Sequence, residues 1–98
     1  MKPAPFEQLL TQLEDVSKSK DSSYPVSADH CFLRIAYDAL FPGPWDQYIG
    51  KPAWKHLSQT QIKTVQELLS KMLEDPAICR KLNIESLKKR NASKAYSS

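Results

Sequence analysis

Three side chains with complementary chemistry recur at four-residue intervals, namely His30, Arg34 and Asp38. In a helix this spacing stacks them on one face. An imidazole titrates near neutral pH, and a guanidinium binds a phosphate or a carboxylate through two parallel hydrogen bonds. The face would therefore suit anion binding or acid–base chemistry. The alternative interpretation is an exposed Arg34–Asp38 ion pair that stabilises the helix by about 0.3–0.5 kcal/mol.

Aromatic residues extend this candidate site. Tyr37 and Phe41 project to the same side of the helix as the histidine, arginine and aspartate. The loop that follows carries Trp45 and Trp54, and large amphipathic rings of this kind dominate binding hot spots. Both tryptophans could instead close the core of a small domain. The binding interpretation requires the loop to fold over the helix face.

Other chemistries find little support in the residue types. The soft metal ligands His30, Cys31, His56 and Cys79 contain no zinc-type pair, so no metal site is predicted. Cys31 falls in an apolar stripe, where a thiol stays protonated and unreactive. With two glycines in the chain there is no phosphate-cradling loop, so no nucleotide cofactor and no catalytic residue is assigned.

The basic end of the chain suggests a different partner. Residues 80–98 carry six lysines or arginines against one glutamate, whereas residues 1–79 carry eight against ten acidic residues. Within this end, residues 77–90 resemble the second half of a helix-turn-helix, with a turn at Asn83. Nucleic-acid binding through Lys88, Lys89 and Arg90 is therefore one alternative, and a solvated basic tail is the other.

Helical periodicity positions these residues. Apolar residues recur at helical spacing from Pro5 to Ser17, and a polar linker follows over residues 17–25. Ser27 is the expected N-cap of a central helix over residues 28–41. The apolar stripe of this helix is predicted to be buried, with the polar face opposite. The apolar stripe comprises Ala28, Cys31, Phe32, Leu33, Ile35, Ala36, Ala39 and Leu40.

Capping signals locate the remaining helices. Ser58 and Gln61 form a capping box that begins a long helix over residues 59–74. Asp75 and Pro76 begin a shorter helix that runs to about Leu82. We expect a break at Asn83, at most one helical turn over residues 84–87, and a frayed basic tail over residues 91–98.

The length of 98 residues accommodates one domain with one core. No stretch alternates apolar and polar residues, so the expected fold is all-α, a small orthogonal bundle of four to five helices. The first ten residues contain no apolar run of the length that a signal peptide or a membrane helix requires. A cytoplasmic location with no membrane contact and two reduced cysteines is therefore expected.

Three segments together resemble a set of small uncharacterised helical proteins, some of which are labelled acetyltransferases. They are HCFLRIAYDALF followed by Trp45, KPAW, and DPAICRKLNIESLKKR, and they span residues 30–90. The resemblance implies a small helical domain and assigns no functional residue. The acetyltransferase fold has a mixed sheet and a glycine-containing pyrophosphate turn, and the residues here match neither feature.

The sequence thus predicts a small binding or regulatory domain for an unknown protein or a small anionic ligand. The predicted binding residues are His30, Arg34, Tyr37, Asp38, Trp45 and Trp54. Nucleic-acid binding through the basic end and a small enzyme that uses the polar face remain the alternatives.

Overall fold

A computed structural model describes residues 4–19 and 22–97 of the chain, and these residues form an all-α bundle. Within those ranges there is no strand. Four α-helices and two 3-10 turns follow one another in the order α1 (Ala4–Ser17), α2 (Asp29–Leu40), η1 (Trp45–Gln47), η2 (Ala53–Lys55), α3 (Gln59–Glu74) and α4 (Pro76–Ser97). The predicted fold class is confirmed.

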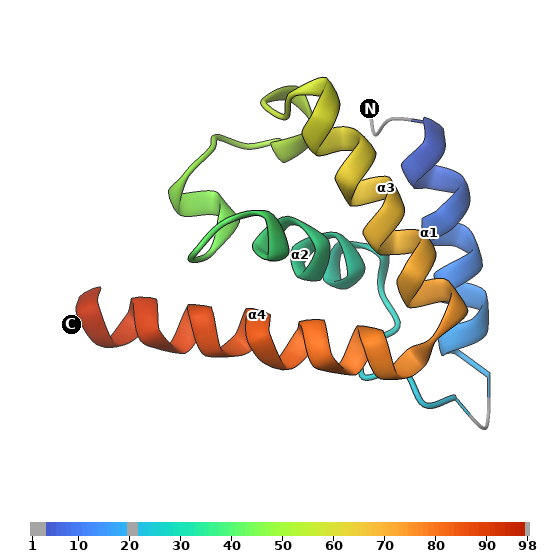
Figure 1. The fold of residues 1–98 in the computed structure, drawn as a ribbon. Coiled ribbons are helices and arrows are strands. Elements are labelled where there is room, and N and C mark those ends of the chain that lie inside the picture. The colour runs from blue at the N-terminus through green and yellow to red at the C-terminus, as the bar shows by residue number, and fades with distance from the viewer. Residues whose placement is uncertain (1–3, 20–21, 98) are drawn as a thin grey trace.

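Helices α2 and α3 each contact the other three helices of the bundle. Figure 1 shows α1 and α3 side by side, while α2 runs above the long helix α4. The apolar side chains between these helices form one core, whose fully buried members are Phe6, Leu13, Phe32, Ile35, Ala36, Val65, Leu69, Met72 and Cys79. Both cysteines are free thiols.

Local signals begin α3 and α4 where the sequence predicts them. The Ser58 hydroxyl accepts a hydrogen bond from the Gln61 backbone N–H at 3.1 Å, and the Gln61 side chain accepts one from the Ser58 N–H at 2.9 Å. The carboxylate of Asp75 accepts a hydrogen bond from the Ala77 N–H at 2.9 Å, directly ahead of α4. These caps satisfy N–H groups that a helix leaves without partners in its first turn.

The start of α2 differs from the prediction. Its N-cap is Ala28, which offers no side-chain hydrogen bond, and Ser27 lies outside the helix. Asp29 is the first helical residue, and its carboxylate accepts a hydrogen bond from the His30 N–H at 2.7 Å. A carboxylate in the first turn stabilises the positive end of the helix dipole, which partly replaces the missing cap.

The buried face of α2 is also wider than predicted. Phe32, Ile35 and Ala36 are buried as expected, whereas Ala39 is exposed. Tyr37 and Asp38, which the apolar pattern places on the solvent side, are buried. Asp38 is buried because α4 packs on the side of α2 that the sequence leaves to solvent, whereas the ring of Tyr37 packs against Trp45 of the following loop.

The prediction of a break at Asn83 is wrong. Helix α4 runs without interruption from Pro76 to Ser97, so residues 84–87 do not form a separate short turn. Residues 91–97, predicted as a frayed tail, continue the same helix, and Ser98 lies outside the described residues. Asn83 is buried, and its side-chain oxygen accepts a hydrogen bond from Arg34 on α2. This tertiary contact outweighs the weak helix propensity of asparagine.

The predicted linker contains no helix after Ser17 among its described residues. Tyr24 nevertheless attaches it to the core, since its hydroxyl donates to the carbonyl oxygens of Met72 and Leu73 at 2.7 and 3.0 Å. In the described ranges no helix combines the length and the apolar character that a membrane span needs.

Candidate functional site

Asp38 is completely buried between α2 and α4 and does not belong to an exposed row with His30 and Arg34. Arg90 donates to it from Nε at 2.9 Å and from a terminal nitrogen at 3.1 Å. The Ser86 hydroxyl donates at 2.5 Å, and the Trp45 backbone N–H donates at 2.9 Å. The predicted Arg34–Asp38 ion pair is therefore wrong, because this carboxylate joins α4 and the start of η1 to α2.

Lys89 reinforces the same junction. Its ammonium group donates to the backbone oxygens of Asp38 and Phe41 at 2.6 and 2.8 Å. A lysine in this position satisfies carbonyl groups that a helix leaves unpaired at its C-terminus. Of the three residues considered for nucleic acid, Lys89 and Arg90 thus bind within the chain, and Lys88 is exposed. The continuous helix α4 also removes the turn that a helix-turn-helix needs.

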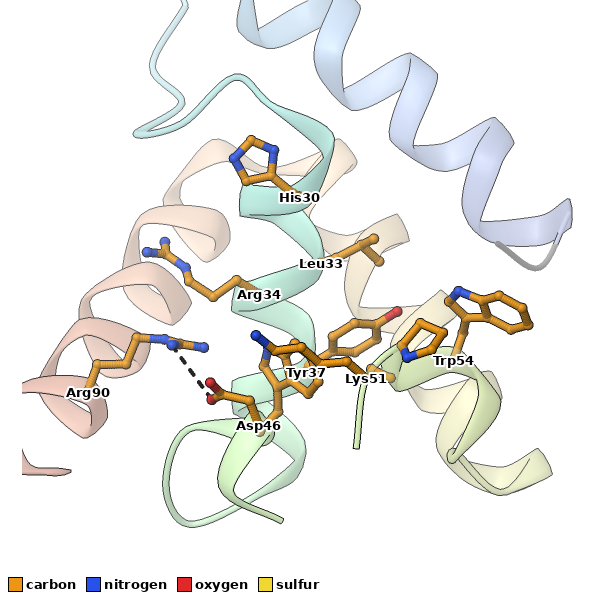
Figure 2. A pocket seen from close by; sticks show the side chains of 11 residues that line it. His30, Leu33, Arg34, Tyr37, Asp46, Lys51, Trp54 and Arg90 are labelled. Atoms are coloured by element: carbon orange, nitrogen blue, oxygen red, sulfur yellow. Dashed lines mark ion pairs between the residues drawn. The ribbon is translucent and has the colours of Figure 1, made fainter. Parts of the chain in front are cut away.

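The other predicted site residues come together around one groove, shown in Figure 2. Helix α2 contributes a row of side chains, the loop between α2 and α3 covers it, and α4 reaches in with Arg90. The groove has a volume of about 480 Å³, which is in the range of small-molecule sites. We call it the aromatic groove, and it is lined by His30, Leu33, Arg34, Tyr37, Trp45, Asp46, Lys51, Pro52, Ala53, Trp54 and Arg90.

The loop folds over α2 through contacts between aromatic rings. The rings of Tyr37 and Trp45 meet edge to face, with centroids 5.4 Å apart. Farther along the loop, Tyr48 stacks on Phe41 at 5.3 Å. Trp45 and Trp54 are each half-buried, and both line the groove. Trp45 also packs against the core, as the core interpretation of this residue expects.

Cationic groups lie at one side of the aromatic groove. In Figure 2, Arg34 and Arg90 enter from the side on which Asp46 lies, and Trp54 stands at the other. A terminal nitrogen of Arg90 lies 3.8 Å from the Asp46 carboxylate. Arg34 donates to Asn83, while its Nε is buried without a hydrogen-bond partner. The groove therefore combines apolar walls with an excess of positive charge.

Tyr37 presents an unpartnered hydroxyl at this site. The residue is 4% exposed, and its hydroxyl oxygen is buried without a hydrogen-bond partner. Figure 2 shows the hydroxyl turned toward the side of the groove where Leu33 and Trp54 lie. Burial raises the pKa of Tyr37 to about 12, so the group remains a hydrogen-bond donor at neutral pH.

His30 lies at the rim, since its side chain is 81% exposed and its ring nitrogen is 3.7 Å from the Asp29 carboxylate. Among the described lining residues there is no serine, threonine or cysteine that could serve as a nucleophile. Burial raises the pKa of the Cys79 thiol to about 11, which keeps it protonated inside the core. Over the described ranges no group of three or more potential ligands is placed to hold a metal ion.

The sequence did not single out several residues of this region. Asp46, Lys51 and Pro52 line the groove, and only their membership of the tryptophan-rich loop could have indicated this. Ser86 is buried, and its hydroxyl donates a hydrogen bond to Asp38. Ser86 lies three residues after Asn83 and four residues before Arg90. This spacing places the three side chains on one face of a helix, and it was the signal in the sequence that could have indicated Ser86.

The fold and the site together define a small all-α domain with an aromatic, cation-bearing groove. No protein-family model, no curated protein and no solved structure matches the chain.

Replacing Tyr37 with phenylalanine is expected to raise the free energy of unfolding by about 1 kcal/mol, because it removes a buried hydroxyl that has no partner. The matched control is Tyr24→Phe, which removes a hydroxyl bonded to two carbonyl oxygens and should lower the free energy of unfolding by about 1 kcal/mol. Urea denaturation of both variants measures the difference. Equal losses of stability would contradict the assignment of Tyr37 as unpartnered.

Proposed function

We propose that this chain is a binding domain and that the aromatic groove is its ligand site. The observation that carries the proposal is the convergence of five predicted binding residues on one groove, although they come from two separate segments of the sequence. These residues are His30, Arg34, Tyr37, Trp45 and Trp54. Apolar pockets with a few convergent polar groups are the usual form of a ligand site.

Binding has more support than catalysis. The groove offers cations, aromatic walls and a buried hydroxyl, and these groups recognise and orient a ligand. A group-transfer site commonly uses a serine, threonine or cysteine nucleophile beside a base, and the lining residues within the described ranges include none of these three residue types. The small-enzyme alternative therefore rests on the polar face alone.

Nucleic-acid binding through the basic end also has less support. Lys89 and Arg90 are committed to Asp38 and to the end of α2, so a phosphate would have to compete with hydrogen bonds that hold the fold together. Of the three residues first considered, this leaves Lys88 as the one exposed at the surface.

The proposal can be tested by amide-resolved NMR with a mixed library of apolar and charged fragments. Shift changes should concentrate on the groove, including the indole N–H signals of Trp45 and Trp54, the only two tryptophans of the chain. Trp54→Ala should abolish these changes. Ile84→Ala removes an exposed apolar side chain of α4 outside the groove lining and should leave them intact. Shift changes scattered over the surface, or equal loss in both variants, would contradict the proposal.

A further inference from the structure

The charge balance of the aromatic groove restricts the ligands that it suits. Three cations line it, Arg34, Lys51 and Arg90. The buried carboxylate of Asp38 holds Arg90, and Asp46 contributes a second negative charge beside it. With the exposed His30 left aside, the three positive and two negative charges leave an excess of one positive charge.

A single excess charge matches a monoanion. A carboxylate carries one negative charge at neutral pH, whereas a phosphate monoester carries about 1.5 to 2. The chain itself places a carboxylate, that of Asp46, near Arg90 at the cationic side. A guanidinium or ammonium group binds a carboxylate through charge-assisted hydrogen bonds, which are stronger than those between neutral groups.

The remainder of the groove suits an apolar body. Leu33, Trp45, Pro52 and Trp54 surround it, and half-buried indole rings provide flat apolar walls. The hydroxyl of Tyr37 is turned away from the cationic side in Figure 2 and lacks a partner. A buried hydroxyl without a partner costs free energy, so a ligand acceptor that satisfied it would gain affinity.

We infer that the ligand of the aromatic groove is a small monocarboxylic acid with an aromatic or branched apolar body. Its carboxylate lies among Arg34, Lys51 and the one terminal nitrogen of Arg90 that does not bond to Asp38. A hydrogen-bond acceptor at the far end of the ligand pairs with the Tyr37 hydroxyl. This inference rests on the proposed function, because it assigns the chemistry of the ligand to the same groove.

The carboxylate is tested with 3-phenylpropionate and its uncharged amide, monitored by intrinsic fluorescence, since both tryptophans of the chain line the groove. The acid should bind about tenfold more tightly than the amide. Lys51→Met should remove this preference. Lys63→Met, which removes the same charge from an exposed position on α3, should retain it.

The acceptor is tested with 3-(4-acetylphenyl)propionate, which adds a carbonyl at the far end of the same acid. It should bind about five- to tenfold more tightly than 3-phenylpropionate, whereas Tyr37→Phe should bind the two acids with equal affinity. A gain that persists in Tyr37→Phe, or no gain in the unmodified chain, would overturn the pairing with Tyr37.

The outcomes separate this inference from the proposed function. Equal affinity for acid and amide, or tighter binding of 2-phenylethyl phosphate than of the acid, would overturn the monocarboxylate while the groove remained a ligand site. If 3-phenylpropionate fails to bind although NMR fragments occupy the groove, the inference fails by itself. If no fragment of any charge occupies the groove, the proposed function fails together with the inference.

The carboxylate could belong to a free acid or to the C-terminus of a peptide. Comparing a peptide that ends in phenylalanine with N-acetylphenylalanine distinguishes these two sources. Tighter binding of the peptide would overturn the assignment to a small molecule.

Discussion

The Asp38→Ala variant is expected to lose about 3–5 kcal/mol of the free energy of unfolding. Its carboxylate is fully buried and accepts hydrogen bonds from Ser86, Arg90 and the Trp45 backbone. Removal of the carboxylate leaves a partly buried guanidinium without its counter-charge and a buried hydroxyl without its acceptor. Because domains of this size are stable by about 5–15 kcal/mol, the loss would be a large fraction of the total. Urea denaturation followed by circular dichroism measures it.

Asp46→Ala is the matched control, since Asp46 is an exposed carboxylate that approaches the same arginine at 3.8 Å. This variant should lose less than about 1 kcal/mol, as exposed ion pairs contribute little. Similar losses in the two variants would contradict the structural role assigned to Asp38. A double-mutant cycle of Asp38→Ala with Arg90→Met then isolates the energy of the pair, because each single variant leaves one partner unpaired.

The Phe6→Ala variant is expected to lose about 3–5 kcal/mol of the free energy of unfolding. The ring of Phe6 is fully buried in the common core, so its truncation creates a cavity between α1 and the rest of the bundle. The loss of stability should appear in circular dichroism and also in tryptophan fluorescence. The fluorescence reports on Trp45 and Trp54, which line the aromatic groove and do not belong to α1. Coincident transitions would show that α1 unfolds together with the groove.

Val16→Ala is the control for this variant, because Val16 belongs to the same helix and is 41% exposed. It should change the free energy of unfolding by no more than about 0.5 kcal/mol. If Phe6→Ala left the fluorescence transition in place and altered only the circular dichroism, α1 would be an independent unit, contrary to the shared core.

The candidate site could be predicted in part because helical spacing is a local property. Residues 30, 34 and 37 share one side of α2 at a periodicity that the sequence displays. The contact of the loop tryptophans with this side is not a local property. It depends on the contact between Tyr37 and Trp45 and on the hydrogen bond from the Trp45 N–H to Asp38. The presence of Asp46 and Lys51 in the groove lining could not be predicted for the same reason, because loop residues have no periodic pattern.

What the sequence alone determined is the set of helices whose ends carry local signals. The Ser58–Gln61 capping box and the Asp75–Pro76 start are formed by residues within three positions of one another, so neighbouring residues suffice to specify them. The residues that α3 buries, Val65, Leu69 and Met72, recur at helical spacing and are likewise a local pattern.

Only the tertiary structure decided that α4 continues through Asn83 and that Asp38 is buried. The partners concerned, Arg34 with Asn83 and Asp38 with Ser86 and Arg90, are 48 to 52 residues apart in the chain. A polar side chain is costly to bury until its partner is in place, and local sequence contains no record of a partner so distant. The packing of α4 against α2 supplies those partners, and it brings Arg90 into the lining of the aromatic groove.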